Sequence, residues 1–189
     1  MAIRIVTGEP GSGKTYLMTK LVLRALRAKR SVWTNYSIHW PEKNYNKFTN
    51  IEFFLTLEKG LVGLDEIHRY FDARNWAKFP DWAKAKFNQH RHDGLDVIGS
   101  CQWFGQIDKN VRLLTVELID CEKVKRFGKH WVVARHYKRV KSLKSLRYYH
   151  RYSHKTWHLI NPAIYNRYDT TEKISATAYK KKWQIKRFQ

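Results

Sequence analysis

One octapeptide near the start of the chain limits the fold more than any other stretch. Residues 8–15 read Gly-Glu-Pro-Gly-Ser-Gly-Lys-Thr and match the phosphate-binding loop pattern G-x-x-x-x-G-K-[ST] at every fixed position. Residues 2–7 before it form a short apolar run typical of a buried strand, and residues 15–28 after it carry apolar side chains at helical spacing. This order predicts an α/β fold of the P-loop NTPase type, with a mainly parallel sheet flanked by helices.

The residue types of the loop suit a bound triphosphate. Its glycines permit the backbone N–H groups to approach the phosphates, and the positive end of the following helix points at the same place. Lys14 is predicted to reach the β and γ phosphates of ATP, and the Thr15 hydroxyl to ligate Mg²⁺. The predicted nucleotide-binding residues are Gly8, Glu9, Pro10, Gly11, Ser12, Gly13, Lys14, Thr15 and Tyr16.

A second motif follows at residues 61–66, Leu-Val-Gly-Leu-Asp-Glu, an apolar run that ends in two carboxylates. Alone, such a run is usually a strand end with solvated acids. Next to a phosphate-binding loop, the run predicts that Asp65 holds a water on the magnesium ion. Glu66 is then predicted to act as the general base that polarises the attacking water. The pair therefore indicates hydrolysis of ATP, whereas a small-molecule kinase is disfavoured because Glu66 suits water activation better than transfer to a bound acceptor.

Three further side chains are candidates for the phosphate site. Residues 95–102 are expected to form a strand with Gln102 at its tip, where the amide would sense the γ-phosphate or simply cap the strand. Arg91 and Arg112 are candidates for an arginine supplied to the nucleotide of a neighbouring subunit. The composition of protein surfaces favours the alternative that each is a surface or structural arginine.

Between these motifs, the pattern predicts the remaining elements of the core. Residues 30–38 alternate apolar and polar side chains and are expected to form a strand, residues 39–50 a loop, and residues 51–59 a helical segment. A helix is expected to begin at Pro80 and to run to about residue 92.

The positive charge of the chain is concentrated in its last third. The whole chain has a formal charge of +21, and residues 123–189 carry 19 Lys and Arg against 2 Asp and Glu, whereas residues 1–122 carry 18 against 14. We therefore expect a P-loop core at residues 1–122 and a basic extension at residues 123–189 that packs on it. Such an extension indicates a polyanionic partner.

The extension begins with two expected strands, residues 115–123 and 130–140, joined by a hairpin turn at Gly128. Beyond residue 140, basic residues alternate with aromatic ones, and this pattern continues into a basic tail at residues 179–188. Cations and stacking rings are typical of a groove for single-stranded nucleic acid. The same residue types also fit an anionic membrane surface, and many of the rings could instead complete the core.

The remaining composition favours a reducing cytoplasm. The two cysteines, Cys101 and Cys121, have no paired-ligand spacing, no stretch approaches the length of a membrane span, and the first strand leaves no room for a signal peptide. We expect the protein in a host cytoplasm, with the inner face of the membrane as a second location.

Several segments together resemble a known family. Residues 63–76, residues 89–98, Gln102 and residues 107–112 are similar to the zonula occludens toxin-like family, which includes the gene I assembly ATPases of filamentous phages. Residues 32–35 resemble the second strand of that family, and residues 164–170 resemble its "Y-x-x-Y-D-T" segment. The likeness covers about residues 1–170.

The resemblance implies a P-loop ATPase of the additional-strand catalytic-glutamate type that acts in virion assembly, extrusion or packaging of viral DNA. Lys14, Thr15, Asp65 and Glu66 occupy the motif positions, and viral assembly proteins and copies of the same chain, in a ring that could be a hexamer, are the implied partners. Filamentous-phage members continue into a membrane span, whereas this chain ends at Gln189 without an apolar segment. We expect either an intact soluble relative or the cytoplasmic part of a longer protein. The alternative function is a nucleotide-dependent adaptor at a membrane or partner surface that hydrolyses ATP slowly.

Overall fold

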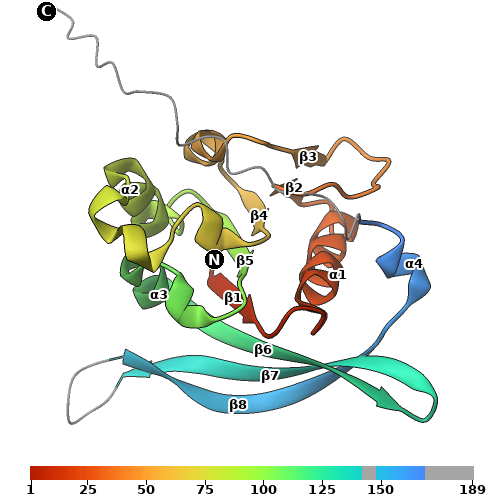
Figure 1. Ribbon diagram of the computed structural model, residues 1–189. Helices are drawn as coiled ribbons and strands as arrows, with labels where there is room; N and C mark the ends of the chain where they lie inside the picture. The colour runs from red at the N-terminus through yellow and green to blue at the C-terminus, as the bar shows by residue number, and fades with distance from the viewer. Residues whose placement is uncertain (142–147, 169–189) are drawn as a thin grey trace, which may run out of the picture.

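The polypeptide forms a mixed β-sheet with helices on both faces of its central part (Figure 1). The computed structural model describes residues 1–141 and 148–168. Within these residues the sheet has eight strands in the order β3-β2-β4-β5-β1-β6-β7-β8. The parallel strands are β1 (Ile3–Thr7), β2 (Ser31–Thr34), β3 (Tyr45–Lys47), β4 (Gly60–Leu64), β5 (Leu95–Ser100) and β6 (Thr115–Arg126). The antiparallel strands are β7 (Lys129–Lys141) and β8 (Tyr148–Leu159).

The strand order confirms the predicted fold class. The strand that leads into the phosphate-binding loop, β1, pairs with β5 on one side and β6 on the other, and β5 separates it from β4, which carries the acidic motif. This intervening β5 is the additional strand of the predicted type. Because these strands are parallel, their carboxyl ends meet at one edge of the sheet.

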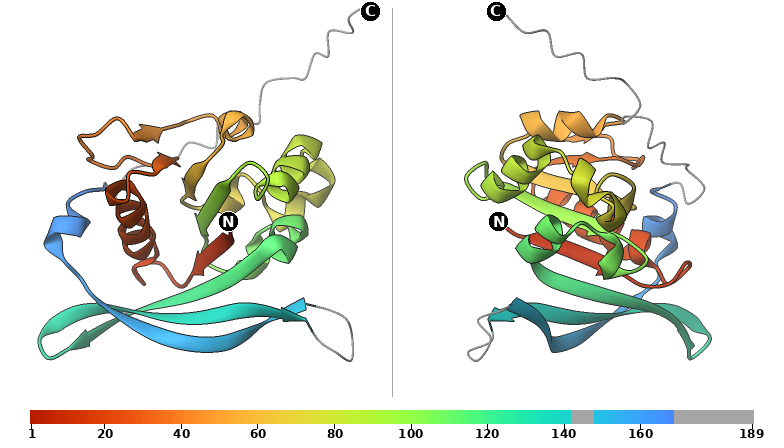
Figure 2. Two further views of the ribbon diagram at one scale, coloured as in Figure 1. Left: turned by 180° about the vertical axis from the view of Figure 1, so that it is seen from behind. Right: turned by 60° about the vertical axis from the view of Figure 1, so that its left-hand side comes forward.

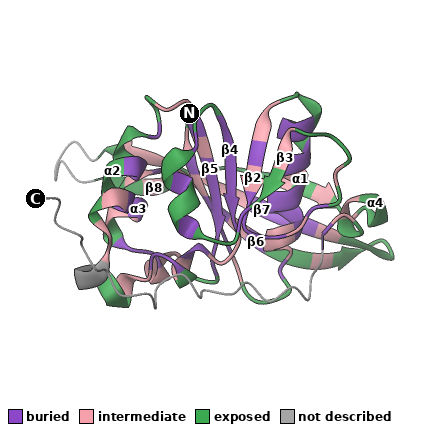
Figure 3. Cartoon of the chain, turned by 90° about the horizontal axis from the view of Figure 1, so that it is seen from above, coloured by how far each residue is buried: buried purple, intermediate pink, exposed green. Residues whose placement is uncertain are grey.

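Helices cover both faces of the central strands. The α-helices are α1 (Lys14–Arg27), α2 (Asp81–Gln89), α3 (Lys109–Leu114) and α4 (Pro162–Tyr165). Short 3₁₀ turns are η1 (Ile51–Thr56), η2 (Ile67–Arg69), η3 (Ala73–Lys78) and η4 (Phe104–Gln106). Figure 1 shows α1 on one face and α2 with α3 on the other, and Figure 3 shows β4 and β5 buried between these layers.

The hydrophobic core is correspondingly divided into two clusters. Alternate residues of β1 serve both, since Ile3 and Ile5 pack with residues of α2 and α3, and Val6 packs with residues of α1. Burial on both faces explains why the central strands read as continuous apolar runs in the sequence.

Two expectations for the edge of the sheet were wrong in part. The strand expected at residues 30–38 ends at Thr34, because the Thr34 hydroxyl binds the carbonyl of Tyr36 and the chain bends there. Residues 39–50 are not entirely a loop, since β3 lies within them and pairs in parallel with β2. A three-residue strand carries too short a pattern to be recognised.

The expected helices are present with small differences. Residues 51–56 form the 3₁₀ turn η1, whose start is capped by the side chain of Asn50, so the helical segment is shorter and tighter than expected. Pro80 precedes α2 as its N-cap residue and is not its first helical residue. The helix α2 ends at Gln89.

The hairpin predicted around Gly128 is confirmed, and it is longer than expected. Strands β6 and β7 pair from Glu117 to Lys138 across a turn in which Phe127 and Gly128 have φ of 51° and 70°. The sequence did not predict β8, which pairs antiparallel with β7 along residues 148–159. The domain boundary expected at residue 122 falls inside β6, so one sheet continues across it.

Beyond β8 the chain returns to the far edge of the core. Tyr168 is buried and forms a β-bridge with Ile38, beside β2. The remainder of the segment 164–170, from residue 169, and the predicted basic tail lie outside the described residues. In the described part of the chain, no helix is long and apolar enough to cross a membrane.

Candidate phosphate and metal site

The phosphate-binding loop lies at the carboxyl end of β1, and its glycines are required by close packing. Gly8 and Gly13 have φ of 140° and 91°. A Cβ atom on Gly8 would lie 2.4 Å from the carbonyl oxygen of Cys121, and one on Gly13 would lie 2.4 Å from a methyl group of Val132. The loop is therefore wedged against β6 and β7, a contact that the sequence did not predict.

The lysine of the loop is already directed along it. The Lys14 ammonium group donates hydrogen bonds of 2.8 Å to the carbonyl oxygens of Gly8 and Glu9. Burial lowers the pKa of Lys14, while the negative charge of Asp65 acts in the opposite direction. A half-buried ammonium group held inside the loop is well placed to receive phosphate oxygens.

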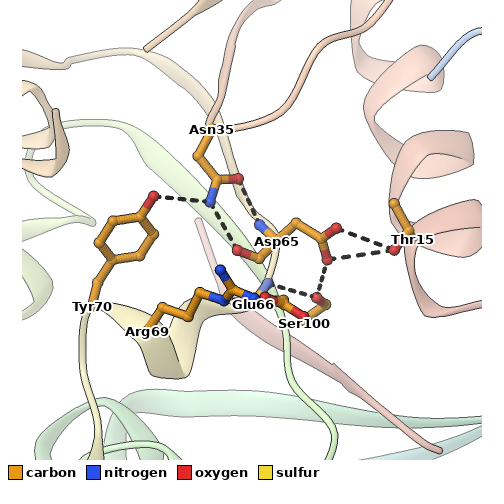
Figure 4. Close-up of polar contacts among 7 residues, drawn as sticks. All are labelled: Thr15, Asn35, Asp65, Glu66, Arg69, Tyr70 and Ser100. Atoms are coloured by element: carbon orange, nitrogen blue, oxygen red, sulfur yellow. Dashed lines mark hydrogen bonds and ion pairs between the residues drawn. The ribbon is translucent and has the colours of Figure 1, made fainter. Parts of the chain in front are cut away.

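Thr15 and Asp65 meet across the edge of the sheet, as predicted (Figure 4). The Thr15 hydroxyl, on the first turn of α1, lies 3.2 Å from a carboxylate oxygen of Asp65, directly after β4. Burial raises the pKa of Asp65, although hydrogen bonds from Ser100 and Thr15 oppose that effect. Hydroxyl and carboxylate oxygens at this spacing fit Mg²⁺, which prefers hard oxygen ligands and keeps several waters.

Ser100 is a third member of the cluster that the sequence analysis did not single out. Its hydroxyl donates a short hydrogen bond to the Asp65 carboxylate and accepts one of 3.0 Å from the N–H of Glu66. Ser100 is the last residue of β5 and is fully buried. A small polar residue at the end of an apolar strand could have identified Ser100 as a site residue. The prediction instead placed the end of that strand at Gln102.

Asn35 fixes the backbone of the acidic motif. Its side-chain oxygen accepts from the N–H of Asp65 at 2.7 Å, and its amide nitrogen donates to the carbonyl of Asp65 at 2.8 Å and to the Tyr70 hydroxyl at 3.4 Å. Asn35 comes directly after β2, the neighbour of β4 in the sheet. Its position could be assigned only once the strand order was known.

Glu66 stands at the turn that leaves the sheet. Its φ of 51° and ψ of 48° are left-handed, which is uncommon for a residue with a side chain. The carboxylate is about one-third exposed and forms a close ion pair with Arg69, one turn of η2 further on. Figure 4 shows this pair beside Asp65 and Ser100. Glu66, the predicted base, therefore lies at the edge of the sheet that carries the phosphate-binding loop, but its carboxylate is paired with an arginine.

Gln102 lies beside the loop and outside the hydrogen-bonded cluster of Thr15, Asp65 and Ser100. Its carbonyl oxygen accepts from the N–H of Gly8 at 3.2 Å, and the residue is exposed. It lines a cavity of about 630 Å³ together with residues 8–12 and Arg135. The sensor role of Gln102 stays a prediction.

The two candidate arginines lie away from this cluster. Arg91 is exposed in the turn that precedes β5, at the edge of the sheet where the parallel strands begin. Arg112, on α3, donates to the carbonyl oxygen of Ile107 at 2.9 Å and lines a separate cavity of about 230 Å³. A role for either residue at the nucleotide of the same chain is disfavoured by this placement, and a role in a neighbouring copy stays a prediction.

The wall of the larger cavity opposite the loop carries charges that the sequence analysis passed over. Arg135 of β7 forms ion pairs with Asp120 and Glu122 of the adjacent β6. These side chains lie across one antiparallel pair of strands, a relation that becomes visible only with the register.

Comparisons with known proteins agree with this geometry. Residues 41–184 match the family model described as zonular occludens toxin (Zot). A Gene 1 protein of Enterobacteria phage I2-2 is 29% identical, with 68% of this chain and 42% of the phage protein covered. The chain thus spans less than half the length of that curated relative.

Solved structures share the fold. The N-terminal domain of zonular occludens toxin from Neisseria meningitidis superposes with a TM-score of 0.63 at 19% identity, covering 89% of this chain and 98% of that domain. The genome packaging NTPase of Sulfolobus turreted icosahedral virus 2, solved in complex with ATP-gammaS, superposes with a TM-score of 0.56 at 16% identity, covering 79% of this chain and 96% of that one.

Proposed function

Because the chain belongs to the zonular occludens toxin family, we propose that it is a magnesium-dependent ATPase that acts in virus assembly or genome packaging. The observation that carries the proposal is the cluster at one edge of the sheet, in which Thr15 and Asp65 lie 3.2 Å apart at the end of the phosphate-binding loop. Glu66 follows directly on the chain. A phage Gene 1 protein and a viral genome packaging NTPase among the similar proteins support the viral setting.

The residues have distinct proposed roles. Lys14 and the loop N–H groups bind the phosphates, and Thr15 with Asp65 holds the magnesium ion, directly or through water. A magnesium ion held by Thr15 and Asp65 would supply positive charge to offset the charge of the phosphates. Glu66 accepts a proton from the attacking water. Asn35 and Ser100 keep Asp65 and the backbone of Glu66 in place, and we propose Gln102 as a sensor beside the loop.

The proposed partners follow from the charge of the last third of the chain. We propose viral DNA as the polyanion that contacts residues 123–189, together with viral assembly proteins. An arginine from a neighbouring copy, Arg91 or Arg112, would complete the nucleotide site in a homo-oligomer, for which a hexameric ring is our specific proposal. The proposed location is the host cytoplasm, including the inner face of its membrane.

The ion pair between Glu66 and Arg69 favours a second candidate, a slow ATPase that serves as a nucleotide-dependent adaptor at a membrane or partner surface. A carboxylate that is held by a guanidinium group is not free to contact the attacking water until the pair opens. Replacing Arg69 with Ala should therefore raise the basal rate several-fold with little change in KM. Arg74→Ala is the matched control, because it removes an equally short-range ion pair with Asp72 on the same segment. An unchanged or lower rate in Arg69→Ala would contradict this restraint.

The test of the main proposal is steady-state ATP hydrolysis by wild type, Lys14→Ala and Glu66→Gln. Each protein is measured with magnesium alone, with single-stranded DNA, with double-stranded DNA and with anionic vesicles. We expect hydrolysis in wild type, loss in both variants and stimulation by DNA that falls with salt. Stimulation by vesicles alone would favour the adaptor, and hydrolysis that survives in Lys14→Ala would refute the ATPase site.

A separate measurement assigns the role of Glu66. Glu66→Gln should still bind ATP and accumulate the ATP-bound oligomer, because the substitution removes the base and keeps the shape of the side chain. Loss of ATP binding in this variant would show that Glu66 is structural.

A further inference from the structure

The outer face of the long strands carries a cluster of aromatic and basic side chains near the β6–β7 turn. The Trp131 and Trp157 rings, on the paired strands β7 and β8, meet edge to face with centroids 6.3 Å apart. The Arg126 guanidinium lies 5.0 Å from the Phe127 ring and 5.6 Å from the Trp157 ring, and the Lys155 ammonium lies 5.6 Å from Trp157. These five residues are called the turn patch below.

The turn patch is accessible and is turned away from α1. Phe127 is 84% exposed and Trp157 is 41% exposed. Their neighbours on the same strands, Val132 and His158, point the other way, since Val132 packs in the cluster around α1 and His158 contacts Lys20 of that helix. Figure 1 shows the β6–β7 turn extending past the end of α1. Large exposed rings at the end of a long hairpin serve no role in the core.

The charge around the turn patch is predominantly positive. Among the described residues 123–141 and 148–168 there are 11 Lys and Arg and no Asp or Glu. Glu122 of β6 lies on the same face, in register with Val133 and Trp157, but it is ion-paired with Arg135, so the net charge of this surface stays positive. A surface with a net positive charge attracts a polyanion and does not discriminate by sequence. The rings add a requirement for flat, unpaired partners, because bases within a duplex are already stacked.

From this combination we infer that the turn patch binds single-stranded nucleic acid, with Phe127 and Trp157 stacking on bases and Arg126 and Lys155 contacting phosphates. This inference rests on the proposed function, in which a viral nucleic acid is the partner. It adds that the nucleic acid is single-stranded and that the turn patch is the surface that binds it. An anionic lipid surface would use the same charges, but exposed rings beside cations are the combination that binds stacked bases together with their phosphates.

The turn patch is connected to the nucleotide site through the same two strands. Val132, next to Trp131, packs against Gly13 of the phosphate-binding loop. Leu159, two residues beyond Trp157, accepts a hydrogen bond of 2.9 Å from the Tyr16 hydroxyl on α1. A nucleic acid bound at the turn patch would therefore contact the same two strands that contact the phosphate-binding loop through Val132 and α1 through Leu159.

The test is the affinity of the full chain for a fluorescent oligothymidylate, measured by anisotropy at several salt concentrations without nucleotide. We expect the double variant Phe127→Ala, Trp157→Ala to bind about 10-fold more weakly or worse, since one stacked base is worth about that factor. A matched duplex should bind more weakly than the single strand and should be insensitive to this substitution. Phe53→Ala is the aromatic control, because Phe53 is 44% exposed on η1, far along the chain from the patch.

A charge-matched pair completes the design. Lys155→Ala should weaken binding and reduce the dependence of affinity on salt, whereas Lys43→Ala, which removes the same charge from the exposed loop before β3, should change neither. Unchanged affinity in the double aromatic variant would overturn the inference, and so would equal aromatic dependence with duplex DNA. Phosphatidylserine vesicles that bind through Phe127 and Trp157 while the oligonucleotide does not would assign the patch to lipid. ATP hydrolysis by wild type is scored separately, so its absence would refute the ATPase and leave the DNA affinity as an independent result.

Discussion

The central parallel strands and the long antiparallel strands are stabilised in different ways. Every residue of β4 is buried, and the polar groups at its end are paired within the cluster of Thr15, Asp65 and Ser100. In β8 most residues are exposed. The strand is held by its ladder to β7, which Figure 2 shows beside it, and by a few contacts to α1. The first region is held by burial and by paired polar groups, whereas most of the second is accessible to solvent.

The two regions meet at the phosphate-binding loop, where the contact can be broken selectively. Gly13→Ala places a Cβ atom 2.4 Å from Val132 and also forces an alanine to φ of 91°. We expect a loss of about 3 kcal/mol in the free energy of unfolding, from backbone strain together with overpacking, and loss of ATP binding. Urea unfolding followed by circular dichroism measures the first effect.

Gly11→Ala is the control for that experiment. Gly11 has a similar φ of 78°, but a Cβ atom there would meet nothing within 4 Å. It should lose only the strain contribution, about 1 kcal/mol. Equal destabilisation by Gly11→Ala and Gly13→Ala would mean that the packing of the loop against β7 adds nothing to stability. The two regions would then not be coupled through this contact.

The second prediction tests how strictly the central region is held. Asn35→Ala removes both hydrogen bonds to the N–H and carbonyl of Asp65 and leaves these part-buried groups without those partners. We expect a loss of about 2 kcal/mol, accompanied by a large fall in kcat. Asn50→Ala, which removes the exposed cap of η1, should cost about 1 kcal/mol and leave kcat unchanged. An Asn35→Ala variant with normal kcat would show that Asp65 needs no support from β2.

The difference between the regions also decides what the sequence could predict. The loop, Asp65 and Glu66 were found because local spacing specifies them, and buried strands such as β4 and β5 have apolar runs that mark their length. Asn35 and Ser100 were not predicted as site residues, because only the order of β2, β4 and β5 in the sheet brings them to Asp65, and no local sequence pattern specifies that order. The strand β8 was not predicted for a different reason: most of its residues are exposed, so its sequence lacks the alternation of apolar and polar residues that marks a half-buried strand.

The third prediction concerns the pH dependence of the central cluster. The pKa of Asp65 is raised in the folded protein, chiefly by burial. A raised carboxyl pKa favours the folded state below the unfolded value near 3.8, and that contribution is lost as the pH rises through the folded pKa. Asp65→Asn, which keeps the shape without the charge, should therefore raise Tm by a few degrees at pH 7 and lose this advantage at acid pH.

The same variant should lose magnesium-dependent hydrolysis, so the carboxylate lowers stability where it is needed for function. Asp120→Asn is a suitable comparison, because that carboxyl group is an exposed partner of Arg135 on β6. It should leave Tm nearly unchanged. A Tm of Asp65→Asn below that of wild type at pH 7 would mean that the hydrogen bonds from Ser100 and Thr15 outweigh burial.

The smallest effect is expected where α1 touches the end of β8. The buried Tyr16 hydroxyl donates to the carbonyl of Leu159 at 2.9 Å and accepts from the N–H of Asn161 at 3.0 Å. Tyr16→Phe removes both bonds and should lower the free energy of unfolding by about 1 kcal/mol. Tyr152→Phe, at an exposed position of β8, should change it by less than about 0.5 kcal/mol. Hydrogen exchange sharpens the comparison, because opening at this contact should speed exchange in β8 and leave β4 protected. Equal acceleration in both strands would mean that the long strands and the core unfold as one unit.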